Sequence, residues 1–198
     1  MAGRARRGHE EPLPVRAARD TERHRTQVSS YPFLARFGPK RSVTVTPAPL
    51  RYWQYDAPRA FVAVLVVLVV AAWLGFLGRR DGGASAAHEA PIAVVLGVVV
   101  LLFSTGRFTV SDSGLSTDIA GLRQTSSFGV VPLALVQEVV IGSAPPGWPR
   151  PRRRGGWLPG RSRVSVRHLA ADGERERAFT IWVRDPRAFA EALNRPVG

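Results

Sequence analysis

The side chains most able to act as acids, bases or metal ligands lie far apart in the sequence. The four histidines are His9, His24, His88 and His168. No two of them have the HExxH spacing that places a pair of imidazoles on one helix face for zinc. A lone histidine in an expected strand is more often structural than a ligand. The histidines therefore predict no catalytic, cofactor or metal site.

The carboxylates also have structural explanations. Asp112 and Asp172 stand in expected turns, and Asp185 is placed to cap a helix. No glycine motif for nucleotide phosphates occurs in a strand-loop-helix context. The chain contains no cysteine, which excludes disulfides, thiolate metal sites and cysteine nucleophiles. We therefore expect a protein without enzymatic activity.

The densest group of charged side chains is a basic segment, residues 145–163, with the sequence PPGWPRPRRRGGWLPGRSR. Arginine beside tryptophan suits the interface of an anionic membrane, where each arginine contributes about 1 kcal/mol of binding. The candidate contacts with anionic lipid are Trp148, Arg150, Arg152, Arg153, Arg154 and Trp157. Nucleic-acid binding is the less favoured alternative, because no recognition fold accompanies the basic residues. A solvated insertion without a partner is a further alternative.

Two apolar runs predict a pair of membrane-spanning helices. Residues 60–78 form an uncharged run long enough to cross a bilayer core, and residues 90–106 form a second, shorter run in which Pro91 suits the first helical turn. Neither run contains an ionisable residue, which argues against a transport path. Gly75 and Gly97 are the expected points of close helix packing. The alternative, two buried strands of a soluble core, fits such lengths poorly.

The distribution of charge predicts the topology. Residues 1–59 carry 12 basic and five acidic side chains, and residues 107–198 carry 14 and eight. The loop 79–89 carries two of each. The positive-inside rule therefore predicts a two-span protein of the cell membrane with both termini in the cytoplasm. Tyr52, Trp53 and Tyr55 would form an aromatic belt at the inner interface.

The regions outside the spans differ in composition. Residues 1–30 have few large apolar side chains and are predicted to be a disordered basic tail. Residues 31–59 form a juxtamembrane segment in which Val43 and Val45 suggest a short strand. Residues 107–195 form a small antiparallel β domain, in which 145–162 are an inserted basic loop. Its pattern predicts hairpins at "RFTVSDSGLSTDIAG" and "RVSVRHLAADGERERAFTIWV", a strand over 136–141, and a final helix capped by Asp185.

This order of elements resembles bacterial membrane proteins from high-GC genomes that carry a PH-like domain after a transmembrane hairpin. The resemblance rests on "FTVSDSGLST", "VPLALVQEVVI" and "AFTIWVRDPRAFAEAL", and it covers about residues 60–194. It implies a membrane α + β fold in which a C-terminal helix closes a bent sheet, and a family of uncharacterised function. The basic loop and the N-terminal tail depart from the simplest version of that pattern.

The expected function is a scaffold or protein-interaction module apposed to the membrane. Its expected partners are the lipid bilayer, anionic lipid head groups, and either another membrane protein or a second copy of the chain. The alternative is an accessory subunit of an envelope enzyme or transporter. A membrane-tethered nucleic-acid-binding protein is the third reading.

Overall fold

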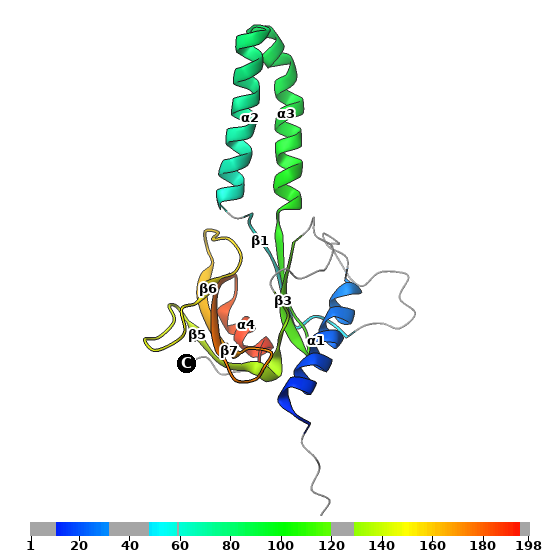
Figure 1. The fold of residues 1–198 in the computed structure, drawn as a ribbon, viewed down its shortest axis with the longest axis vertical. Helices are drawn as coiled ribbons and strands as arrows, with labels where there is room; N and C mark the ends of the chain where they lie inside the picture. The colour runs from blue at the N-terminus through cyan, green and yellow to red at the C-terminus, as the bar shows by residue number, and fades with distance from the viewer. Residues whose placement is uncertain (1–10, 32–47, 59, 120–128, 195–198) are drawn as a thin grey trace, which may run out of the picture.

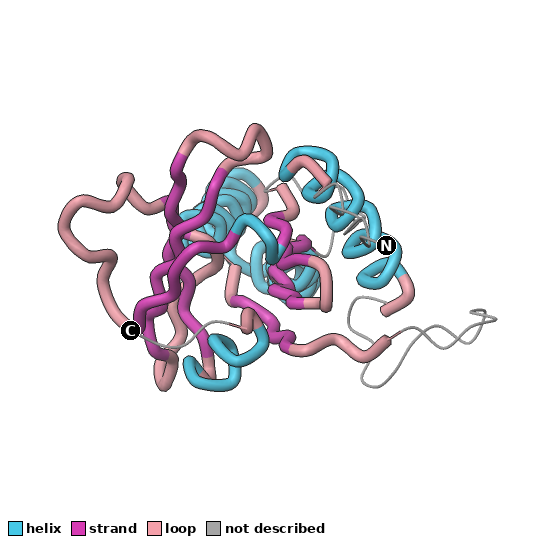
Figure 2. The backbone as a smooth tube through the Cα atoms, turned by 90° about the horizontal axis from the view of Figure 1, so that it is seen from below, coloured by secondary structure: helices cyan, strands magenta, loops and turns pink. Residues whose placement is uncertain are grey.

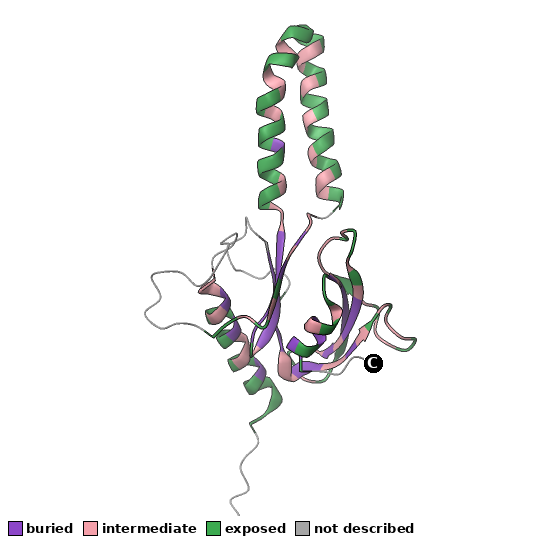
Figure 3. Cartoon of the chain, turned by 180° about the vertical axis from the view of Figure 1, so that it is seen from behind, coloured by how far each residue is buried: buried purple, intermediate pink, exposed green. Residues whose placement is uncertain are grey.

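A computed structural model describes residues 11–31, 48–58, 60–119 and 129–194, and it consists of a helical hairpin standing on a β domain (Figure 1). The hairpin is formed by α2 (Ala60–Arg80) and α3 (Gly83–Phe103). Both helices are long and apolar enough to cross a membrane. Their surfaces are exposed along almost their whole length, as an apolar surface that faces lipid would be (Figure 3). The two predicted spans are therefore present as helices.

The turn between these helices is much shorter than the predicted loop 79–89. α2 continues through Arg80 and α3 begins at Gly83, so Pro91 lies inside α3 rather than in its first turn. Gly82 reverses the chain with a φ of +89°, a conformation that glycine adopts without strain. The residues before Pro91 are rich in alanine, which has the highest helix propensity, and this extends the helix beyond the apolar run. His88 and Glu89 therefore belong to α3.

The first sheet contains a strand from each side of the helical hairpin. It has the order β1 (Tyr52–Asp56), β2 (Gly106–Val110), β3 (Gly114–Ile119) and β4 (Val131–Pro132), with antiparallel neighbours. The predicted hairpin of β2 and β3 is confirmed. The predicted start of the β domain at residue 107 is wrong, because β1 precedes the membrane helices and pairs with β2 along its whole length. The helical hairpin is thus inserted between two adjacent strands.

The second sheet has the order β5 (Val136–Ile141), β7 (Ser162–Leu169), β8 (Glu176–Val183) and β6 (Arg152–Arg153). The predicted β7–β8 hairpin and the strand β5 are confirmed, whereas β6 lies within the predicted insertion and pairs with β8 in parallel. A short 3-10 turn, η1 (Leu133–Leu135), follows β4. The final helix α4 (Pro186–Ala192) begins as predicted, with the Asp185 carboxylate accepting bonds from two backbone N–H groups.

The core lies between the two sheets and is closed by α4. Phe108 of β2, Phe179 of β8 and Phe189 of α4 are almost completely buried there. The Phe189 ring lies 5.5 Å from both the Phe108 ring and the Tyr52 ring, measured between centroids. Tyr52 is therefore a support of the core, and its predicted place in an aromatic belt is wrong. Trp53, half exposed on the opposite face of β1, remains outside this core.

The N-terminal segment contains the largest departure from the sequence prediction. Leu13–Ser29 form the helix α1, which packs beside the first sheet, so the prediction of disorder over residues 1–30 is wrong for this part (Figure 2). Its buried residues are Ala17, His24 and Val28. Only Ala17 and Val28 of this buried stripe are apolar, so its hydrophobic signal is weak, and its third member, His24, hydrogen-bonds to Ser111. Residues 1–10, and the strand predicted around Val43 and Val45, lie outside the described residues.

Candidate functional site

The junction between the β domain and the membrane helices is built from paired strands. β1 ends at Asp56 and α2 begins at Ala60, while α3 ends at Phe103 and β2 begins at Gly106. Asp56 and Gly106 are partners in the antiparallel ladder. Both membrane helices therefore continue from one two-stranded ribbon (Figure 1). Because the connections are so short, the domain has little freedom to move away from the end of the hairpin.

A buried ion pair joins this ribbon to the second sheet. Arg161 Nη1 lies 2.6 Å from Asp56 Oδ1, and the two side chains are 8% and 1% exposed. Arg161 also donates to the Tyr55 carbonyl oxygen. Gln54 Nε2 donates to Asp56 Oδ1 over 2.8 Å and to the Trp182 carbonyl oxygen over 2.7 Å. Burial raises the pKa of Asp56 to about 6, although Arg161 and Gln54 both favour its ionised form. The charge at this junction is thus paired but costly to bury.

Two glycines allow the basic segment to approach the start of α2. A Cβ atom at Gly155 would lie 2.3 Å from Asp56 Oδ2, and one at Gly156 would lie 2.8 Å from the Ala57 carbonyl oxygen. Gly155 also has a φ of +72°. The backbone of the segment therefore touches the last residues before the membrane helix. The next residue, Trp157, is 61% exposed.

The six predicted lipid contacts do not share one surface. Trp157 lies beside the junction, and Arg150, Arg152 and Arg153 are exposed, two of them in β6. The segment 155–161, gold in Figure 1, rises toward α2, whereas residues 143–150 extend to the side of the second sheet. Trp148 accordingly lies over the outer face of that sheet, with the Arg167 guanidinium 5.5 Å from its ring.

Arg154 and Arg107 occupy interior positions. The Arg154 guanidinium lies 4.3 Å above the Phe179 ring, and burial lowers its pKa to about 10. Arg107, the first residue after the predicted second span, is buried and lies 3.5 Å from Asp118 Oδ2, while its Nη1 donates to the Tyr31 carbonyl oxygen. The prediction that Arg154 contacts anionic lipid is therefore wrong, and Arg107 is likewise held inside the domain.

A polar interface beneath α1 contains the histidine that comes closest to a catalytic arrangement. His24 Nδ1 lies 2.7 Å from Ser111 Oγ, and both residues are buried. Burial, with a smaller effect of Arg25, lowers the pKa of His24 to about 4, so the ring is neutral at physiological pH. Ser111 Oγ already accepts from the backbone N–H groups of Ser113 and Gly114. The pair thus holds the β2–β3 turn against α1, which is a structural role.

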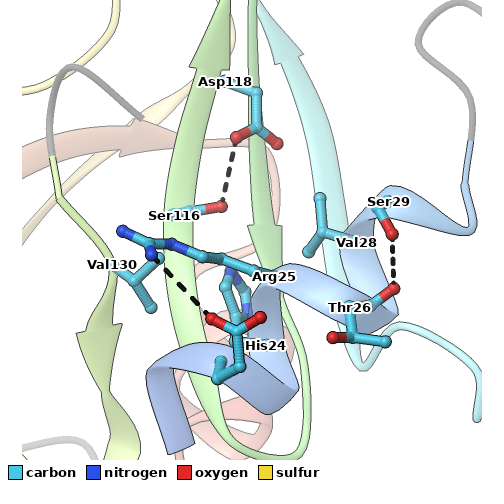
Figure 4. A pocket seen from close by; sticks show the side chains of 9 residues that line it. His24, Arg25, Thr26, Val28, Ser29, Ser116, Asp118 and Val130 are labelled. Atoms are coloured by element: carbon cyan, nitrogen blue, oxygen red, sulfur yellow. Dashed lines mark hydrogen bonds and ion pairs between the residues drawn. The ribbon is translucent and has the colours of Figure 1, made fainter. Parts of the chain in front are cut away.

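The cavity next to this interface is small and mixed in polarity. It has a volume of about 270 Å³ and lies between α1 and β3, with Asp118 and Ser116 facing Arg25 and His24 (Figure 4). The Asp118 carboxylate is engaged by Arg107 and Ser116, and Thr109 and Ser116 share a 3.0 Å hydrogen bond. Among the residues that the structure describes, no three histidines or carboxylates gather as metal ligands.

The two glycines singled out in the membrane helices have different surroundings. A Cβ atom at Gly97 would lie 3.2 Å from Val66 Cγ1, so this glycine sits in the contact between α2 and α3. A Cβ atom at Gly75 would meet nothing within 4 Å. An apolar groove of about 530 Å³ runs between the helices, with Trp73 and Glu89 among its lining residues. Glu89, which the sequence analysis placed in the loop 79–89, thus contributes a carboxyl group to the helical hairpin.

No protein-family model, curated protein or solved structure matches this chain.

Proposed function

We propose that this chain is a non-enzymatic membrane protein that holds a PH-like interaction domain against the cytoplasmic surface of the bilayer. The observation that carries the proposal is the junction: both membrane helices continue from paired strands, and the buried Asp56–Arg161 pair links those strands to the second sheet. A domain joined in this way moves together with its helices. Such a connection suits a scaffold whose binding surface keeps a constant height above the membrane.

The PH-like assignment is supported by the arrangement of the sheets. A C-terminal helix closes the core, as the family resemblance implies, and two four-stranded sheets enclose it. The cytoplasmic location follows from the excess of arginine on the side of the hairpin that bears both the β domain and α1. Fold alone assigns no ligand, and the chemistry of the surface indicates where the domain can bind.

The surface best placed for membrane contact combines Trp157 with exposed arginines. Trp157 follows the glycines that touch residues 56–58, and an indole ring suits the bilayer interface. Arg150, Arg152 and Arg153 would add attraction to anionic head groups from the more distant part of the segment. Trp148 and Arg154 do not belong to this surface, because their rings and charges are engaged by the second sheet.

Single-cysteine variants offer a direct test, because the natural chain contains no cysteine. Trp157→Cys and its matched control Trp148→Cys would each be labelled with a fluorophore in proteoliposomes that contain nitroxide lipids. We expect strong quenching at position 157 and weak quenching at position 148. Equal quenching at the two positions would contradict the proposed placement of the domain. Replacing Arg150, Arg152 and Arg153 with serine should reduce the added quenching that anionic lipid produces at position 157.

The accessory-subunit alternative is favoured by one separate observation. The groove on the helical hairpin is apolar except for Glu89, and a carboxyl group in apolar surroundings is usually paired with a polar group. A larger membrane protein could supply that group from a helix of its own. Mild crosslinking in the native membrane, followed by identification of the captured protein, distinguishes this role from self-association.

Competition of single-stranded DNA with anionic vesicles for the protein would instead support nucleic-acid binding.

A further inference from the structure

A second cavity lies far from the membrane junction, between α1 and the opposite end of the second sheet. It has a volume of about 420 Å³, within the range of small-molecule sites. His168 and Arg177 line it and are partners in the β7–β8 ladder. The other end of that ladder pairs Ser162 with Val183, next to Arg161 at the junction. The length of β7, eight residues, thus separates this cavity from the membrane side.

Three nitrogen-bearing side chains from three segments converge on this cavity. They are Arg154, which follows β6, His168 of β7 and Arg177 of β8. No aspartate or glutamate occurs among the described residues that line it. Burial lowers the pKa of His168, and the nearby charges of Arg154 and Arg177 lower it further. The fold therefore holds two positive charges near an imidazole at a site with no carboxylate in its described walls, an arrangement that a bound anion would stabilise.

The orientation of the imidazole is set by the backbone. His168 Nδ1 lies 2.7 Å from the Leu169 carbonyl oxygen, which can only accept, so Nδ1 carries the proton. The other ring nitrogen, Nε2, is therefore an acceptor in the neutral ring. Protonation of Nε2 would turn it into a donor toward an anion in the cavity. Arg177 is exposed, so its guanidinium can close over a ligand without disturbing the core.

The remaining walls are mostly apolar. α1 contributes Ala17 and Ala18, the segment through β4 and η1 contributes Val131 and Leu135, and Leu169 comes from β7. A ligand that fits both the basic side chains and the apolar walls of the cavity has a negatively charged group and a short apolar body. Since the helix α1 forms one wall, the cavity exists only when α1 is docked on the β domain.

We propose that this cavity binds a small soluble organic anion, a carboxylate or a phosphate monoester with a short apolar body, through Arg154, His168 and Arg177. The soluble source is favoured over a lipid head group because the cavity lies at the end of the second sheet opposite the membrane junction. The scaffold would then carry a ligand-dependent contact between α1 and the β domain. This goes beyond the proposed scaffold role and does not depend on lipid contact by Trp157.

The test is a titration of the full chain in nanodiscs of neutral lipid with phenyl phosphate, followed by calorimetry. We expect saturable one-to-one binding, weakened about tenfold or more by Arg177→Ser, as the loss of a charge-assisted hydrogen bond to a ligand requires. Arg163→Ser is the matched control, because Arg163 lies on β7 but outside the cavity, with its guanidinium bonded to Ser143 Oγ. Its affinity should equal that of the natural chain.

A second variant keeps the charges and fills the space. Ala18→Trp places a large ring at an exposed position on the cavity wall and should abolish binding of phenyl phosphate while α1 stays folded. No saturable binding to the natural chain, or equal losses in the Arg177 and Arg163 variants, would overturn the proposal. If anionic lipid in the nanodisc competes with phenyl phosphate, the proposal of a soluble ligand is overturned and the cavity is assigned to lipid head groups. None of these outcomes bears on the quenching test of the membrane-facing surface.

Discussion

Arg161 and Asp56 form a buried ion pair across 105 positions of sequence, with 2.6 Å between Nη1 and Oδ1. The pair lies where the chain leaves the β domain for the first membrane helix, and it joins the first sheet to the second. Another pair with the same 2.6 Å separation, Arg51 and Asp112, has side chains that are 32% and 50% exposed. Because the two pairs have the same distance and differ in burial, the Arg51–Asp112 pair is a control for the contribution of the buried pair to stability.

Removing one partner of the buried pair should be strongly destabilising. Arg161→Met leaves Asp56 buried without its counter-charge, which should lower the free energy of unfolding of the β domain by about 3–5 kcal/mol. Arg51→Met, at the exposed pair, should cost less than about 1 kcal/mol. Denaturant titration in detergent micelles measures both. The double change Asp56→Asn with Arg161→Met should recover much of the loss, and an additive double variant would show that the charges do not interact.

Alanine substitutions at Gly155 and Gly160 distinguish the free-energy cost of backbone strain from the cost of a steric clash. Both have positive φ, +72° and +77°, but a Cβ atom at Gly160 would meet nothing within 4 Å. Gly160→Ala should therefore cost only the strain of a left-handed residue, about 1–2 kcal/mol. Gly155→Ala adds a collision with the Asp56 carboxylate and should cost clearly more. Thermal unfolding of the two variants checks the order, and equal losses would mean that the junction yields around the added methyl group.

The buried histidine under α1 predicts a loss of stability in acid. The pKa of His24 is lowered to about 4 in the folded protein from 6.5, so between these values the unfolded chain binds a proton that the folded chain does not. Stability from this group is complete above pH 6.5 and falls as the pH decreases toward 4, by about 3 kcal/mol in total. The raised pKa of Asp56 acts in the opposite direction over a similar range.

Comparison with His24→Leu isolates the histidine, because the contribution of Asp56 is the same in both proteins. As the pH falls from 6.5 to 4, the natural chain should lose stability relative to the His24→Leu variant. Urea titrations at a series of pH values provide the measurement. Parallel pH profiles for the two proteins would mean that His24 is not buried in its neutral form.

The two membrane glycines should respond differently to leucine. Gly97→Leu crowds Val66 and should separate α2 from α3, seen as a lower yield of disulfide between cysteines introduced on the facing helices. Gly75→Leu points into open space within this chain and should leave that yield unchanged. If Gly75→Leu nevertheless abolishes self-association or capture of a partner in crosslinking, position 75 contacts another chain. Unchanged association in both variants would move the interaction to the β domain.

Local patterns explain why the β hairpins and the membrane helices could be predicted. Alternation around Asp172-Gly173 specifies β7 and β8, and uncharged runs of sufficient length specify the two spans. The end of the helical hairpin was misplaced, because alanine-rich residues extend α3 beyond its apolar run. The helix α1 was missed for a different reason. Its one buried polar side chain, His24, finds its hydrogen-bond partner, Ser111, 87 positions away.

The sequence by itself determined the two apolar helices, the two β hairpins and the final helix, because hydrophobic period, run length and turn residues act over short stretches of chain. Only the tertiary structure decided that β1 joins the domain across the membrane hairpin and that α1 covers its polar face. It also separated Arg154, held over Phe179, from the exposed arginines beside it. Those outcomes depend on burial and pairing between distant segments, and identical side chains acquire different roles according to the partners that the fold brings to them.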